Sequence, residues 1–60
     1  MPGRDALKRL IGREVDVDVS NGNHHRGHLV NVGRRSLWLL DGEEDRFIAL
    51  ADVADLRATA

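Results

Sequence analysis

The chain has 60 residues, a formal net charge of -1 at pH 7 and no cysteine. Sixty residues hold a single domain (1-60) with a marginal core, which neither disulfides nor thiolate-bound metals can reinforce, so self-association is expected. No apolar stretch reaches the roughly 18 residues of a membrane span, and the N-terminus lacks a secretory pattern, so a cytoplasmic protein is predicted.

The first predicted element is a short helix over about residues 4-11. Leu7, Leu10 and Ile11 have the i, i+3, i+4 spacing of one apolar helix face. Gly12 follows at the position where a left-handed glycine ends many helices. Because about two turns of helix do not persist alone, this segment is expected to pack on the rest of the chain.

The apolar period then changes from helical to two, which predicts short strands over about residues 13-57. Valines alternate with polar residues in the first strand, as in a strand with one buried face: Val15, Val17 and Val19. The Asn21-Gly22 pair that follows is a strong hairpin signal. The return strand, about 23-32, contains Gly27, which indicates a bend or a close backbone approach, with a bulge nearby.

Three more strands complete the predicted sheet. The third, 36-40, is nearly all apolar and is expected to be covered on both faces. An acidic turn over 41-45 leads to the fourth strand, 46-50. A single turn of helix at 51-53 precedes the last strand, 54-57.

A short helix followed by five strands, with a glycine in the second, resembles the Sm/LSm/Hfq family of small barrels. Residues 15-22, running on to Gly27-His28-Leu29, are similar to the first Sm motif in its bacterial Hfq form, and residues 47-56 to the second motif. The resemblance implies a mainly β fold, a strongly bent five-stranded antiparallel Sm/SH3-like barrel. It also implies assembly into a homo-oligomeric ring that binds RNA.

Several positions depart from the RNA pockets of that family. Gly33 stands where the family usually has an aspartate, and Arg35 where Hfq has a base-stacking aromatic residue. Ala49-Leu50 replaces an Arg-Gly pair, and Asp18 stands where Hfq has a purine-stacking tyrosine. The expected fold is unaffected, but RNA recognition in an inner pore is not expected.

The chain also resembles the C-terminal domain of the ribosome maturation factor RimP, over residues 11-17 and 47-58. That domain is a small Sm/SH3-like barrel that docks a protein. The alternative function is therefore an SH3-like protein-docking adaptor, monomeric or dimeric. The two resemblances agree on architecture, and fold analogy alone does not choose between their functions.

The candidate nucleic-acid contacts form the only concentration of positive charge: Arg26, His28, Arg34 and Arg35. An arginine offers a two-pronged donor to phosphate. The alternative is that Arg34 and Arg35 form a solvated turn, or pair with the acidic turn of a neighbouring copy. Zinc needs about four ligands, and Asp or Glu would have to complete a set begun by His24, His25 and His28, so no metal or other cofactor is predicted, although a ring could gather one histidine from each copy into a girdle.

The candidate oligomer interface is apolar and lies on the fourth and fifth strands, which are expected to pair between copies as open sheet edges. These residues would serve the core as well: Phe47, Ile48, Leu50 and Val53. The sole tryptophan, Trp38, is expected in the core or an interface rather than as a stacking platform for bases. No nucleophile or phosphate-loop motif is present, so an enzyme is not predicted.

Overall fold

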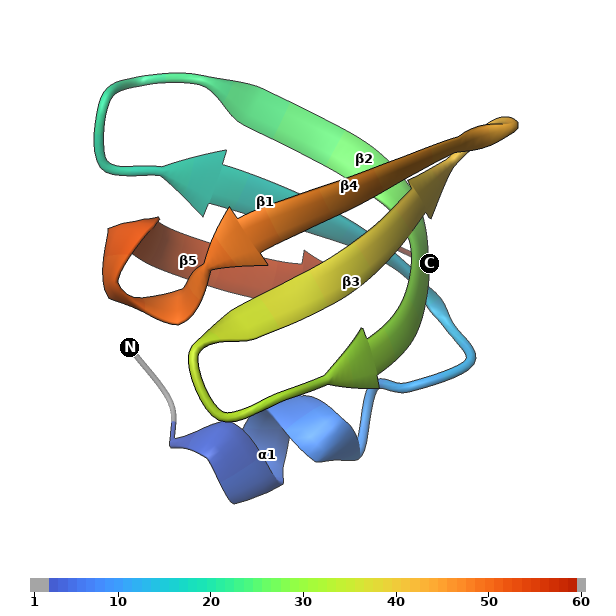
Figure 1. Ribbon diagram of the computed structural model, residues 1–60, viewed down its shortest axis with the longest axis horizontal. Coiled ribbons are helices and arrows are strands. Elements are labelled where there is room, and N and C mark those ends of the chain that lie inside the picture. The colour runs from blue at the N-terminus through green and yellow to red at the C-terminus, as the bar shows by residue number, and fades with distance from the viewer. Residues whose placement is uncertain (1–2, 60) are drawn as a thin grey trace.

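The computed structural model describes residues 3-59 as one short helix followed by five strands (Figure 1). In chain order the elements are α1 (Arg4–Lys8), β1 (Glu14–Val19), β2 (His24–Val32), β3 (Ser36–Asp41), β4 (Glu44–Ala49), the 3-10 helix η1 (Leu50–Asp52) and β5 (Val53–Ala58). All paired strands are antiparallel, in the order β4-β3-β2-β1-β5. The predicted mainly β class is thereby confirmed.

The sheet curls on itself but does not close (Figure 1). Among the described residues β4 and β5 are its two edges, and each has a strand partner on one side only. Closure of the predicted barrel is therefore not confirmed. The curl nevertheless gives the sheet an inner face around the core and an outer face turned away from it.

The curl depends on β2, which pairs with β1 through His28 and with β3 from His28 onward. Figure 1 shows β2 curving around the molecule between these two partners. Gly27 lies at the bend, where an added Cβ would be 2.5 Å from the carbonyl oxygen of Leu40. The close backbone approach predicted there is confirmed. The predicted bulge is present as well, as a register shift between Leu29 and Asn31.

The core is entirely aliphatic. Alternate residues of the strands point inward, so that the strands and α1 bury ten apolar side chains: Leu7, Val15, Val17, Leu29, Val32, Leu37, Leu39, Ile48, Val53 and Leu56. The only two aromatic residues of the chain, Trp38 and Phe47, are not among them. The core is therefore ruled out as the place of Trp38, and its predicted place in an interface stays a prediction.

The helix and β3 differ from the predictions in detail. Regular α1 ends at Lys8, and tighter turns lead on to Gly12, whose amide bonds to Leu29 of β2. This early end leaves Ile11 38% exposed instead of packed beside Leu7. The prediction that β3 is covered on both faces is wrong, because only its inward-facing residues are buried. No helix among residues 3-59 is long and apolar enough to cross a membrane.

Candidate functional site

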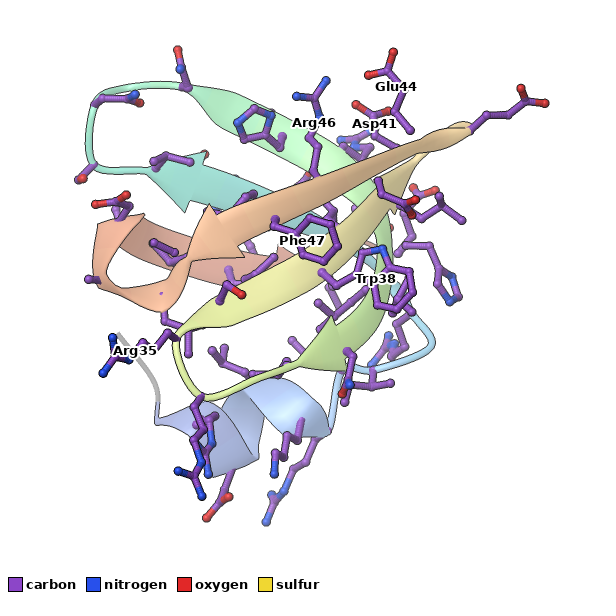
Figure 2. The ribbon with its side chains drawn as sticks, in the orientation of Figure 1. Arg35, Trp38, Asp41, Glu44, Arg46 and Phe47 are labelled. Carbon is purple, nitrogen blue, oxygen red and sulfur yellow. The ribbon has the colours of Figure 1, made fainter. Side chains whose placement is uncertain are left out.

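The structure divides the four predicted nucleic-acid contacts into two places. Arg34 and Arg35 are exposed on the turn between β2 and β3, and Figure 2 shows Arg35 pointing away from the sheet. Arg26 and His28 are exposed on the outer face of the first half of β2. The second half of β2 lies between the two pairs, so the four side chains do not form one cluster. Their role in binding stays a prediction.

Arg26 belongs to a charged ladder on the outer face, which crosses β5, β1 and β2 and consists of Asp16, Asp18, His24, Arg26, Asp55 and Arg57. Arg26 Nε donates to Asp16 Oδ1 at 2.7 Å. At the other side of β1, Arg57 donates to Asp18 at 2.8 Å and to Asp55 at 2.6 Å. Cations and carboxylates are thus interspersed across the three strands, and this face carries mixed charge rather than a basic patch.

The two β1 carboxylates are held ionised by this ladder. The bond from Arg26 lowers the pKa of Asp16 below its ordinary 3.8, and the nearby positive charges reinforce it. The pKa of Asp18 is lowered as well, mainly by its hydrogen bond with His24, at 2.7 Å, and next by the bond from Arg57. His24 lies between both carboxylates, because its other ring nitrogen is 3.2 Å from Asp16.

The remaining positive charge gathers at one end of the molecule. Of the nine Lys and Arg residues, the three on strands form ion pairs: Arg26, Arg46 and Arg57. The other six form no ion pair within residues 3-59 and lie in α1, in the segment that follows it, or in the β2–β3 turn: Arg4, Lys8, Arg9, Arg13, Arg34 and Arg35. We call this set the basic end. Figure 1 shows the turn passing over α1, which packs against β2.

The tip of the β3–β4 hairpin carries the opposite charge. It projects from the sheet on the far side from α1 (Figure 1). Four carboxylates lie there, which we call the acidic tip: Asp41, Glu43, Glu44 and Asp45. Arg46 offsets part of this charge through Asp41, at 3.3 Å, and Glu44, at 3.6 Å (Figure 2). A net charge of -1 therefore conceals two separated regions of opposite sign.

The two aromatic residues lie together on the outer face of the β3–β4 hairpin (Figure 2). Trp38 and Phe47 are cross-strand partners whose ring centres are 5.7 Å apart in a stacked arrangement. The indole Nε1–H of Trp38 donates to Asp45 Oδ1 at 2.8 Å, which fixes the ring. Phe47 is 67% exposed although apolar. An ordered aromatic pair with one exposed ring, beside a sheet edge, is typical of an interaction surface.

The predicted interface residues fall into two groups. Phe47 is exposed beside the open edge of β4, because its side chain is on the outer face, so its predicted part in the core is wrong; Leu50 packs partly against the core. Ile48 and Val53 are buried in the core, with 9% and 5% exposure. Their part in the core is confirmed, while their part in an interface between copies stays a prediction.

The structure offers no enclosed site for a small molecule. Within residues 3-59 there is no pocket, and in the same range no group of three or more His, Asp or Glu side chains is placed to hold a metal ion. The surfaces described above can bind a partner through stacking, backbone pairing and charge.

The sequence patterns predicted neither the basic end nor the aromatic pair. The signal for the aromatic pair was present, because a two-residue turn after Asp41 sets a register in which Trp38 faces Phe47. No local pattern shows that the β2–β3 turn lies over α1. The sequence matches no protein-family model and no curated protein, so the family resemblances stay predictions.

Proposed function

We propose that the chain is a non-enzymatic Sm-like binding protein that assembles with copies of itself into a ring, in which β4 of one copy pairs with β5 of the next. The observation that carries this proposal is the pair of open edges at the two ends of one curled sheet. An open edge presents unpaired backbone donors and acceptors, which a second chain can satisfy.

The composition of these edges supports pairing. Natural sheet edges are commonly protected by proline, by charged side chains, especially lysine, or by a very short strand. Neither β4 nor β5 contains proline or lysine, each is six residues long, and the charges of β4 are confined to its first half, which leaves Phe47–Ala49 uncharged. A core of ten aliphatic side chains in a 60-residue chain also gains stability from any surface buried between copies.

The proposed ligand of the assembled protein is RNA in the cytoplasm, contacted through phosphates at the basic end. Arg34 and Arg35 are exposed and unpaired among the described residues, whereas Arg26 is held by Asp16. In a ring, each copy would contribute one such turn, and several weak phosphate contacts to one RNA strand would together give a higher affinity than any single contact. Such contacts position a nucleic acid without reading its bases, which fits a chain without the base pockets of Hfq.

The second candidate is an SH3-like adaptor that docks a protein partner as a monomer or dimer, as the resemblance to RimP implies. The observation in its favour is the outward-facing aromatic pair, half-buried Trp38 and exposed Phe47, since aromatic residues are enriched at protein interfaces. The acidic tip beside this pair also disfavours RNA at that surface.

Light scattering at high micromolar concentration tests the proposal and separates the two candidates. The chain mass is 6.7 kDa, so a closed hexamer or heptamer has a mass several times larger and supports the ring. A monomer under these conditions contradicts the ring and favours the adaptor.

A further inference from the structure

We propose that the basic end binds double-helical rather than single-stranded RNA, and that it does so through phosphate contacts alone. In this proposal the cations of α1 contact the ligand together with those of the β2–β3 turn. The inference rests on the proposed RNA role and names the class of RNA that this surface takes.

The six cations of the basic end are available to an anionic ligand. All six are exposed, and none forms an ion pair within residues 3-59. Asp5 is the only carboxylate of α1 (Arg4–Lys8). The backbone that carries these charges is fixed to the sheet, because Leu7 is buried in the core and the carbonyl of Arg13 accepts a bond from Leu29 of β2.

The bases of a single strand find no stacking partner among the aromatic residues at this end. Proteins that bind single strands without sequence preference combine a basic groove with aromatic side chains on which the bases stack. Trp38 and Phe47 lie instead on the β3–β4 hairpin, beside the acidic tip, and the histidines lie in the first half of β2. Within residues 3-59 there is also no pocket that could receive an unstacked base.

A double helix presents phosphates in the arrangement that such a surface needs. It carries about one negative charge per 1.7 Å of its axis, whereas one strand carries about one per 3.4 Å. Along the longest dimension of the molecule, 25 Å, a duplex therefore offers about 15 phosphates and a single strand about 7. About half of the duplex phosphates face the protein in fixed positions. A flexible single strand must be ordered to present the same number, and without stacking nothing offsets that loss of entropy.

The release of counterions favours the duplex as well. The logarithm of the binding constant falls with the logarithm of the salt concentration by about 0.9 per phosphate contact on a duplex and about 0.7 on a single strand. Between 1 M and 0.1 M salt this difference amounts to a factor of about 1.6 per contact, or about 16 for six contacts. Since the six cations need not all touch phosphates at once, we expect a preference of at least about fivefold at 0.1 M salt.

Fluorescence anisotropy with an RNA duplex of about 16 base pairs, and with each of its two strands alone, tests this preference. The duplex is made from a U-rich strand and its A-rich complement, so each strand is its own sequence control. We expect the duplex to bind at least about fivefold more tightly than either strand at 0.1 M salt, with a steeper dependence on salt. Equal or tighter binding of either strand overturns the inference. Absence of binding by all three RNAs at low salt removes the proposed RNA role itself, so the two failures are distinguishable.

Two double variants with the same loss of charge locate the contacts. Lys8→Ala with Arg9→Ala removes two unpaired cations at α1, and alanine is compatible with the helix. Arg46→Ala with Arg57→Ala removes two cations that carboxylates already hold. We expect the first variant to bind the duplex about tenfold or more weakly, with a salt slope smaller by about 2, and the second to keep the native slope. Equal slopes in the two variants overturn the part of α1 in the site, and thermal unfolding checks that both are folded.

Discussion

Replacing Gly27 with alanine adds one methyl group at the bend of β2, where the backbone of β2 lies close to that of β3. The new Cβ would lie 2.5 Å from the carbonyl oxygen of Leu40, 3.0 Å from its carbonyl carbon and 3.1 Å from the side chain of Leu39. Ordinary contact begins at 3.4 Å, so the two backbones would have to separate by about 0.9 Å, the difference between 3.4 and 2.5 Å. Two of the three contacted atoms are backbone, and a rotamer change cannot relieve those contacts.

Overpacking of this kind costs about 1–3 kcal/mol, and we expect about 3 kcal/mol here because the obstruction is backbone. The usual gain of about 0.4–1 kcal/mol from a stiffer unfolded chain offsets only part of it. A chain of this length has a free energy of unfolding of roughly 3–9 kcal/mol. The net cost is then about 2–2.6 kcal/mol, a large share of the stability, and the Tm falls by roughly 8–21 °C.

Thermal and urea unfolding followed by circular dichroism measure this effect. Gly33→Ala is the graded control, since its Cβ would meet only the Ser36 carbonyl oxygen, at 3.2 Å, and should cost less than about 1 kcal/mol. Equal stability of Gly27→Ala and the native chain would refute the close approach at the bend.

Three further predictions follow from the charged and aromatic surfaces. The pKa values of Asp16 and Asp18 are lowered on folding, so their stabilisation is present above the ordinary 3.8 and is lost as pH falls through the lower folded values. The urea concentration at the unfolding midpoint should therefore fall when the pH is lowered from about 6 to about 3. The fall should be smaller in the double variant Asp16→Asn with Asp18→Asn. Identical falls in the two proteins contradict the ladder. Binding of a U-rich oligonucleotide should weaken as salt rises. It should disappear in Arg34→Ala with Arg35→Ala but largely persist in Arg26→Ala, and no binding at low salt contradicts the RNA role. Asp45→Ala should change the Trp38 emission spectrum at a cost under about 1 kcal/mol, whereas an unchanged spectrum contradicts the indole bond.

The features that sequence predicted well are those with local causes. The alternating valines and the Asn21-Gly22 pair set β1 and its hairpin without reference to the rest of the chain. Gly27 was recognisable because a glycine inside a strand has few other uses. The helix end was less predictable, since the chain passes into tighter turns after Lys8 and Gly12 then bonds to the distant Leu29.

The surfaces were harder to predict because they depend on which strands are neighbours. Arg26 belongs to a basic run in sequence, yet it is committed to Asp16, ten residues earlier, once β1 and β2 pair. Trp38 has an apolar setting in sequence, but its face of β3 is outward and only Phe47 stacks on it. Period and composition specify the inner face of a sheet well, and cross-strand register determines what the outer face presents.

The central claim is that the open edges β4 and β5 pair between copies, and amide hydrogen exchange read residue by residue tests it most directly. We expect the amides of β4 (Glu44–Ala49) and β5 (Val53–Ala58) that point to the open edges to be protected from exchange at high protein concentration and to exchange rapidly on dilution. The β2 amides should keep the same protection at both concentrations. Edge amides that exchange rapidly at every concentration, or concentration-dependent protection confined to other segments, would contradict the account.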